Sequence, residues 1–166
     1  MRFNTIILAV FAVVMMMAAP VAAYEESDTV KVAYPLDFAD VKRVHFMLNT
    51  LNNLVKEYQK NLVDYEISIV AYGPGLQYVM KDFIGTGFVG MPYLSRGGPV
   101  GNGTQGRMAA LKQLAGDNLR IFVCENTMEK KNVNKEQLQP YTEVTPGGVL
   151  KLIELQREGA ALIKIQ

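Results

Sequence analysis

Two kinds of hydrophobic pattern alternate along the chain. Short runs of apolar, mostly β-branched residues are typical of buried strands, and segments whose apolar residues recur every three or four positions are typical of amphipathic helices. The short runs predict strands at residues 30–34, 65–72, 119–123, 143–145 and 161–165. The longer spacing predicts helices at residues 39–60, 76–83, 104–115 and 149–157, with shorter helical turns between residues 125 and 138.

Polar residues, prolines and glycines between these segments predict where the elements begin and end. Pro35 should stop the first strand, because proline lacks the amide hydrogen that a strand ladder needs. Asp37 is the expected cap of the first helix, and Gly116 is the expected end of the helix at residues 104–115. The last helix should bury the face that carries the following residues: Val149, Leu152, Ile153 and Gln156.

Strands that alternate with helices imply parallel strand pairing through right-handed crossovers. The predicted fold class is therefore α/β, as a three-layer α/β/α sandwich. The chain has 166 residues, which suits one ordinary domain that needs no disulfide or metal to bury a core. We find no internal repeat, so one domain is expected over residues 24–166.

The first 23 residues have the pattern of a secretory signal peptide. Arg2 gives a positive start, residues 5–17 are an uncharged hydrophobic run, and residues 21–23 are small, as before a cleavage site. Cleavage after Ala23 would send the protein to the periplasm or out of the cell, with no membrane segment left. The alternative is a retained membrane anchor, for which residues 5–19 are short.

Charge argues against a nucleic-acid partner. The full chain has 17 basic and 16 acidic side chains, and loss of Arg2 with the signal peptide leaves equal numbers of each. A mature protein with zero net charge has no overall positive field to attract a phosphate backbone.

Cys124 is the single cysteine of the chain, and it follows the predicted strand at residues 119–123. The carboxyl ends of parallel strands are where open α/β sheets collect ligands. Asn126 is expected to cap the next helix, with Glu129 completing a capping box, and Thr127 lies beside it. A helix start favours the reactive thiolate, but a lone exported cysteine is equally compatible with a buried inert thiol or with pairing to another chain.

Two glycine-rich segments have the composition of anion-binding loops. Gly73-Pro74-Gly75 follows a predicted strand and opens a helix, so its amides could hold a small anion or stabilise charge on the thiol; the alternative is a tight turn. Residues 85–90 match the letters of a dinucleotide-binding motif. They lack the preceding strand, the following helix and the downstream acidic residue, so we reject that interpretation and predict no cofactor.

The remaining candidate residues do not complete a catalytic or metal site. His45, the single histidine, falls inside the first predicted helix, where packing is the expected role, and no cysteine–histidine pair is inferred. No second cysteine or histidine is present to help bind a metal. Phe83, Phe88, Met91 and Tyr93, just before and within the glycine-rich segment 84–103, are expected to be exposed, as a lid or as a surface for another subunit.

Three parts of the sequence resemble the DsrE/DsrF-like family, which includes the sulfur-relay subunits of the TusD type. They are the strand and turn at residues 70–75, the strand-to-helix segment at 122–128, and the ending from 144–149 through 155–156 to Gly159. The match covers nearly all of the mature chain. Two features differ from the family pattern: the glycine-rich segment is long, and the signal peptide would remove the protein from the cytoplasm, where the relay proteins work.

The resemblance implies a five-stranded, mainly parallel sheet and a homo-oligomer, commonly a trimer or hexamer. In the relay proteins a cysteine after this strand carries a persulfide, and Cys124 is similar to that residue by position. The first hypothesis is therefore an exported persulfide carrier or sulfurtransferase that exchanges sulfur with donor and acceptor proteins. Gly73, Gly75, Asn126 and Thr127 would surround the sulfur.

The second hypothesis is a non-catalytic module for assembly or small-ligand binding, in which the cysteine only packs. A hydrolase or dehydrogenase is less consistent with the sequence, because neither a catalytic triad nor a cofactor motif is present.

Overall fold

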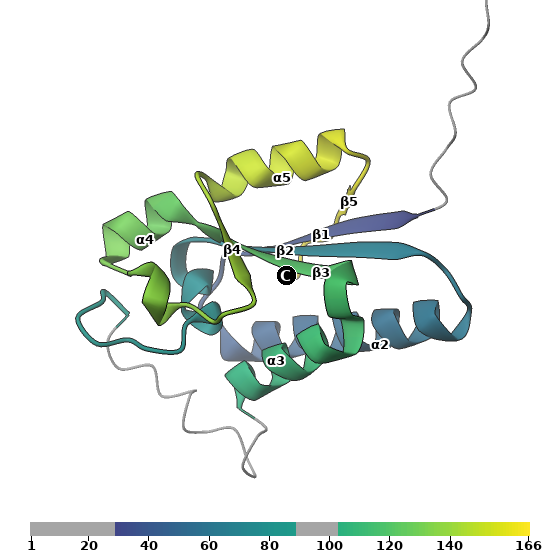
Figure 1. The fold of residues 1–166 in the computed structure, drawn as a ribbon, viewed down its shortest axis with the longest axis horizontal. Helices are drawn as coiled ribbons and strands as arrows, with labels where there is room; N and C mark the ends of the chain where they lie inside the picture. Colours follow the sequence, from purple (N-terminus) through teal and green to yellow (C-terminus); the bar gives the residue numbers. More distant parts are fainter. Residues whose placement is uncertain (1–28, 89–102) are drawn as a thin grey trace, which may run out of the picture.

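The computed structural model describes residues 29–88 and 103–166 (Figure 1). The predicted signal peptide, most of the glycine-rich segment, Met91 and Tyr93 lie outside these residues. Within the described part, no helix is both long enough and apolar enough to cross a membrane.

Five parallel strands form one sheet in the order β4-β3-β2-β1-β5. Their bounds are β1 (Val30–Leu36), β2 (Tyr65–Ala71), β3 (Leu119–Cys124), β4 (Thr142–Thr145) and β5 (Ala161–Leu162). The five predicted strands are all present, although β5 is shorter than predicted. The parallel sheet expected from the family resemblance is confirmed.

Helices cover both faces of the sheet, which confirms the three-layer α/β/α sandwich. α2 (Val41–Lys60) and α3 (Thr104–Ala115) lie on one face, and α5 (Gly148–Arg157) lies on the other (Figure 1). α4 (Glu125–Lys131) follows β3 directly. Short 3-10 helices complete the set: η1 (Gly73–Val79), η3 (Gly116–Asn118) and η4 (Lys135–Gln137).

The core is divided by the sheet into a large and a small cluster. The large one lies under α2 and α3 and includes Ile121 and Val123 of β3. The small one lies under α5 and includes Phe122. Because successive side chains of a strand point to opposite faces, Cys124 shares the α5 face with Phe122.

Pro35 does not stop β1, contrary to the sequence-based prediction. It lies inside the strand and pairs in register with Val70 of β2. The carbonyl of Ala33 accepts a hydrogen bond from Ile163 on the β5 side, and Pro35 faces the same side because backbone groups alternate along a strand. The short β5 pairs only with Val32 and Ala33, so the proline costs no ladder bond in the described structure.

The cap of α2 was also predicted wrongly. Asp40, not Asp37, is the cap, and its carboxylate accepts a hydrogen bond of 2.8 Å from the amide of Arg43. The segment predicted as a helix at residues 76–83 is instead the 3-10 helix η1, which starts at Gly73 and ends at Val79.

Two predictions of burial were wrong as well. α5 buries Leu152 and Leu155, whereas Val149 and Ile153 are 57% and 50% exposed and Gln156 is exposed. In the start of the glycine-rich segment, Phe88 is buried, with the ammonium of Lys131 5.4 Å from its ring, and Phe83 packs partly against the core.

Candidate functional site

Cys124 lies at the carboxyl edge of the sheet, between β2 and β4. It is the last residue of β3 and the cap residue of α4, and its free thiol is buried, with 5% of the residue exposed. On one side it pairs in register with Thr145 of β4. On the other side the β2–β3 register pairs Ala71 with Val123, so Tyr72 follows as the neighbour of Cys124.

Tyr72 and Asp37 extend this row of side chains toward β1. The Tyr72 hydroxyl donates a hydrogen bond of 3.3 Å to a carboxylate oxygen of Asp37. Burial raises the pKa of Tyr72, and the charge and hydrogen bond of Asp37 raise it further, followed by a smaller effect of a charged Cys124 thiol. Three titratable groups from three strands therefore meet at one sheet edge.

The amino-terminal end of α5 lies against this row. Gly148, the first residue of α5, packs directly on Tyr72, because a Cβ at Gly148 would lie 2.8 Å from the Tyr72 Cβ. The cap residue is Gly147, which has no side chain to accept hydrogen bonds from the first amides of the helix. The end of a helix with free amides carries partial positive charge, which favours a negatively charged group at this edge.

Gly73 and Thr127 are brought together, as the sequence-based site required. The Gly73 amide donates a hydrogen bond of 3.0 Å to the Thr127 hydroxyl, which joins the start of η1 to α4. Gly73 has a positive φ of 52°, a conformation that favours glycine. Because its amide is already bonded to Thr127, Gly73 helps to hold α4 in place next to Cys124.

Gly75 has a packing role. A Cβ at this position would lie 2.0 Å from the carbonyl oxygen of Leu36 at the end of β1. This contact explains why the turn needs a glycine there, and it agrees with the alternative interpretation of the segment as a tight turn.

Asn126 does not cap α4. The helix begins two residues earlier than predicted, at Glu125, with Cys124 as its cap residue and no side-chain hydrogen bond at the cap. Asn126 is exposed on the first turn, so the predicted capping box with Glu129 is wrong. A capping box does form further on, between Asn134 and Gln137.

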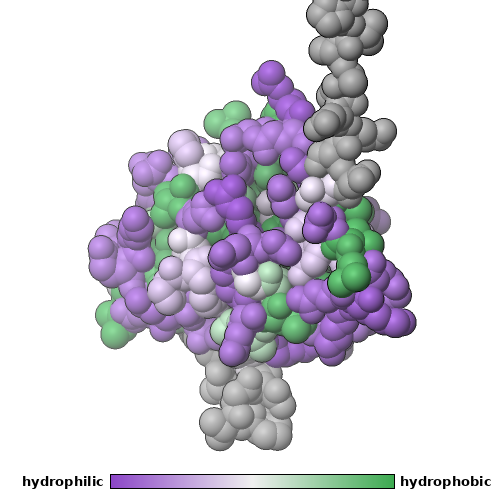
Figure 2. Space-filling model, turned by 45° about the vertical axis from the view of Figure 1, so that its right-hand side comes forward, coloured by the Kyte–Doolittle hydropathy of each residue, from purple (hydrophilic) through white to green (hydrophobic). Residues whose placement is uncertain are grey.

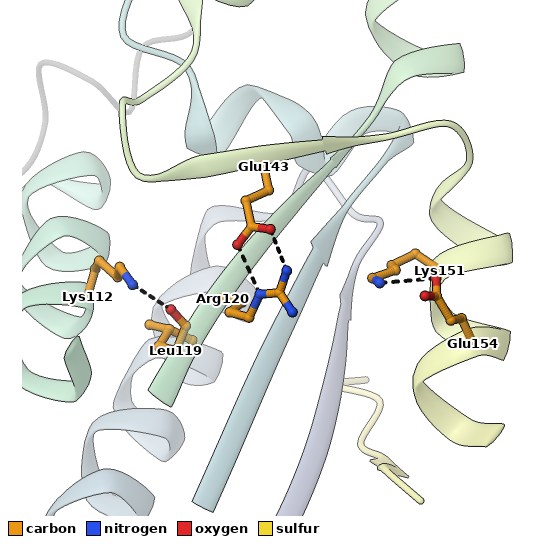
Figure 3. Close-up of polar contacts among 6 residues, drawn as sticks. All are labelled: Lys112, Leu119, Arg120, Glu143, Lys151 and Glu154. Carbon is orange, nitrogen blue, oxygen red and sulfur yellow. Dashed lines mark hydrogen bonds and ion pairs between the residues drawn. The ribbon is translucent and has the colours of Figure 1, made fainter. Parts of the chain in front are cut away.

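The basic side chains on the α5 face are held by carboxylates. Arg120 of β3 makes two hydrogen bonds to Glu143 of β4, of 3.0 and 2.5 Å, and Lys151 of α5 forms an ion pair of 3.0 Å with Glu154 (Figure 3). Arg120 and Lys151 also lie over the ring of Phe122. Both cations are thus paired with carboxylates and with the Phe122 ring, and neither has a recorded contact with Cys124 in the described structure.

His45 lies on the opposite face of the sheet. Its Nε2 is hydrogen bonded to the Thr104 hydroxyl at 2.9 Å, between α2 and α3. It is therefore no partner for Cys124. The described residues contain no group of three or more histidine, cysteine or acidic side chains that could hold a metal ion.

Sequence reasoning missed Tyr72, Asp37 and Thr145 as neighbours of Cys124. The signal was present in the alternation of the strands, because Tyr72 lies two residues after Val70 and so shares its face. What the sequence lacked was the register that sets Tyr72 beside Cys124.

Comparisons with known proteins agree with this fold. A solved structure of a protein of unknown function from Methanobacterium thermoautotrophicum is similar, with a TM-score of 0.59 and 22% sequence identity over 81% of this chain and 98% of that chain. Identity this low shows a common fold only. No curated protein is significantly similar to the sequence. The model of the DsrE/DsrF-like family matches residues 9–165, nearly the whole sequence, and the chain therefore belongs to the DsrE/DsrF-like family.

Proposed function

We propose that the protein is an exported sulfur carrier, in which Cys124 holds a persulfide and passes its outer sulfur to a partner thiol. The observation that carries the proposal is the position of Cys124: the one cysteine of a DsrE/DsrF-like chain ends β3 at the edge where α4 and α5 begin. Helix amino termini favour the thiolate and persulfide anions over their neutral forms.

The transfer needs no cofactor and no net oxidation. The Cys124 thiolate attacks the outer sulfur of a donor persulfide, the donor's S–S bond breaks, and the donor leaves as a thiolate. An acceptor thiolate then attacks the outer sulfur on Cys124, and the Cys124 thiolate is released. Each step forms one S–S bond and breaks one S–S bond, so no oxidant or reductant is consumed.

The burial of Cys124 limits access to its thiol, because reactive cysteines are usually partly exposed. With 5% of the residue exposed, only a small part of Cys124 meets solvent. An S–S bond of about 2.05 Å would move the transferable sulfur outward from the edge. Tyr72 and the Gly73–Thr127 pair would border it, and Asn126, exposed on α4, is placed to meet a partner protein.

Mass spectrometry of the intact mature protein tests this function. Incubation with a polysulfide donor should add about 32 mass units, reversible by a thiol reductant. Cys124→Ser should remove the adduct, and Asn126→Ala, a change at an exposed neighbour, should keep it. A native protein that stays unmodified, while its unfolded form reacts, would mean that Cys124 is an inert core residue.

A second candidate is an assembly module, favoured by the exposed apolar side of α5. Val149, Leu150 and Ile153 are 57%, 66% and 50% exposed. Side chains of this kind on one helix suit a contact with another subunit, and we propose a homo-oligomer, either a trimer or a hexamer. If assembly is the whole function, Cys124→Ala should leave oligomer size and stability nearly unchanged.

Export is part of the proposal. The segment before Tyr24 would be removed, and the mature protein would work in the periplasm or outside the cell, with a sulfur donor or acceptor there. Expression of the full chain in a bacterium, followed by fractionation and amino-terminal sequencing, should give a periplasmic or secreted product that starts at Tyr24. A product that keeps Met1 in the membrane fraction would support the anchor instead.

A further inference from the structure

A groove of about 410 Å³ runs between α2 and α3, on the face of the sheet opposite Cys124. Its floor is apolar and comes from Leu48, Leu111 and Leu114. Its rim is polar, and the longest rim side chains are Lys56 of α2 and Arg107 of α3. This volume is within the range of small-molecule sites.

Hydrogen bonds join the two helices near both ends, and the space between these bonds stays open as the groove. Near the amino ends, His45 bonds Thr104, and Arg107 bonds the amide oxygen of Asn49. Near the carboxyl ends, the Gln59 amide donates to the carbonyl of Leu114 at 3.0 Å. Between these ties α3 offers Ala110, whose one-carbon side chain leaves the space open.

The charge around the groove is of one sign. Two cations and two asparagines line it, with no acidic residue among its lining side chains. Neither Lys56 nor Arg107 forms an ion pair with any residue that the structure describes. Glu57, the carboxylate next to Lys56 in sequence, is turned to Asn61 and Lys60 instead.

The positive charge of Arg107 also acts on His45, which lies between α2 and α3. Burial lowers the pKa of His45, and the positive charge of Arg107 lowers it further. His45 lies one helical turn before Asn49 of the groove lining, and its ring is bonded to Thr104 of α3.

We propose that this groove binds a small organic anion with an apolar body, such as an aliphatic carboxylate. Arg107 and Lys56 hold the carboxylate, Asn49 and Asn52 border it, and the leucine floor contacts the chain. A guanidinium matches a carboxylate in shape as well as charge, and the floor gains from burial of methylene groups. The site is separate from Cys124 and does not depend on sulfur transfer.

NMR titration of the mature protein tests the site, with octanoate as the probe. The single histidine gives one set of ring signals, so His45 is a local reporter. Octanoate should shift these signals and the amides of α2 and α3 saturably, and octylamine, of the same length and opposite charge, should not. Cys124→Ser should bind octanoate as the wild type does, whatever the outcome of the persulfide experiment.

Matched variants separate charge from shape. Lys56→Gln should weaken octanoate binding about tenfold, as expected for the loss of one charged contact of roughly 1.4 kcal/mol. Lys42→Gln, an exposed lysine of the same helix outside the groove, should have no effect. Ala110→Leu should fill the groove and abolish binding. Lys56 is preferred to Arg107 because Arg107 also ties the helices together.

Three outcomes would overturn the proposal. Equal shifts with octanoate and octylamine would mean adsorption on the leucines alone. Unchanged affinity in Ala110→Leu, with a normal unfolding curve, would place the ligand elsewhere. Dissociation of an oligomer by Ala110→Leu, seen by analytical ultracentrifugation, would mean that another copy of the chain covers the groove.

Discussion

Gly73 and Gly75 belong to one turn, but each is a glycine for a different reason. Gly73 needs its positive φ of 52°, and a Cβ there would meet nothing within 4 Å. Gly75 needs its missing side chain, because a Cβ would collide with the Leu36 carbonyl. The first requirement is conformational and mild, and the second is steric and severe.

Alanine at these two positions should therefore have unequal effects on stability. Gly73→Ala should lower the free energy of unfolding by about 1 kcal/mol, the cost of a left-handed residue with a side chain. Gly75→Ala should lower it by more than about 2 kcal/mol, since backbone must move. Urea unfolding of the mature chain measures both, and equal losses would contradict the steric assignment of Gly75.

Tyr141 carries a buried hydroxyl that finds no hydrogen-bond partner among the described residues. Burial alone raises the pKa of this hydroxyl to about 12. Tyr141→Phe should leave the free energy of unfolding unchanged or raise it by up to about 1 kcal/mol, because an unpaired buried polar group is removed. A loss of more than about 1 kcal/mol on thermal or urea unfolding would reveal a partner for the hydroxyl.

At the scale of elements, the helix starts differ in how they are capped. α2 has a side-chain cap from Asp40, whereas α4 starts at Cys124 without one. The uncapped start of α4 leaves amides near the Cys124 thiol, which suits a site that must stabilise negative charge.

Capping predicts a contrast between two substitutions. Asp40→Ala should destabilise the protein by about 1 kcal/mol, the usual loss for a helix cap. Asn126→Ala should change stability by less than about 0.5 kcal/mol, as for other exposed positions. Urea midpoints compare them directly, and a larger loss for Asn126 would restore the cap predicted from sequence.

The strand pair β3–β4 is linked by Arg120 and Glu143, whose side chains are 54% and 46% exposed. The hydrogen bond from Arg120 is the main reason that the pKa of Glu143 falls below its usual 4.5. A carboxyl with a lowered pKa in the folded state adds stability above its unfolded pKa and loses it as pH falls through the folded pKa.

The stability that Glu143 adds should consequently disappear in acid. Relative to Glu143→Gln, the wild type should be more stable by under about 1 kcal/mol above pH ~5, since half-exposed pairs are screened by solvent. The difference should shrink as pH falls below ~4.5, where the carboxyl of the unfolded chain begins to protonate, and disappear once pH is below the lowered pKa of the folded state. Urea unfolding over this range checks the sign, and a difference that grows toward acid would be inconsistent with the ion pair.

For the whole molecule, the two faces of the sheet are covered unequally. α2 and α3 bury the large core on one side, and among the described residues α5 is the helix that covers the other side (Figure 1). On the face seen in Figure 2, hydrophobic residues form separate groups among hydrophilic ones. The exposed apolar side chains of α5 are therefore our candidate for the contact that holds an oligomer together.

Charge placed on α5 should dissociate such an oligomer. Ile153→Lys should shift the mature protein to monomer in analytical ultracentrifugation, because a buried ammonium at a contact would be unpaired. Leu62→Lys, at a leucine that is 91% exposed after α2, is the matched control and should keep the oligomer. If Ile153→Lys keeps its oligomeric mass, another surface forms the contact.

Two errors of the sequence-based account, at α5 and at Pro35, have one physical origin. The spacing of α5 supports two overlapping stripes that share Leu152, and packing of Gly148 on Tyr72 selects the stripe with Leu155. Pro35 was predicted to end β1 because the shortness of β5 is invisible in the local pattern. In each case a contact with a residue distant in sequence decided the outcome. Hydrophobic periodicity carries no information about such contacts.

The sequence by itself determined the order of the elements and the type of most of them, since hydrophobic period and turn residues act over a few neighbouring positions. It also placed Cys124 at the end of β3, and the family resemblance agreed. Only the tertiary structure decided that Tyr72, Asp37, Thr145 and the start of α5 surround this cysteine. Strand register and helix packing bring these residues together across the sheet, and both depend on contacts between distant parts of the chain.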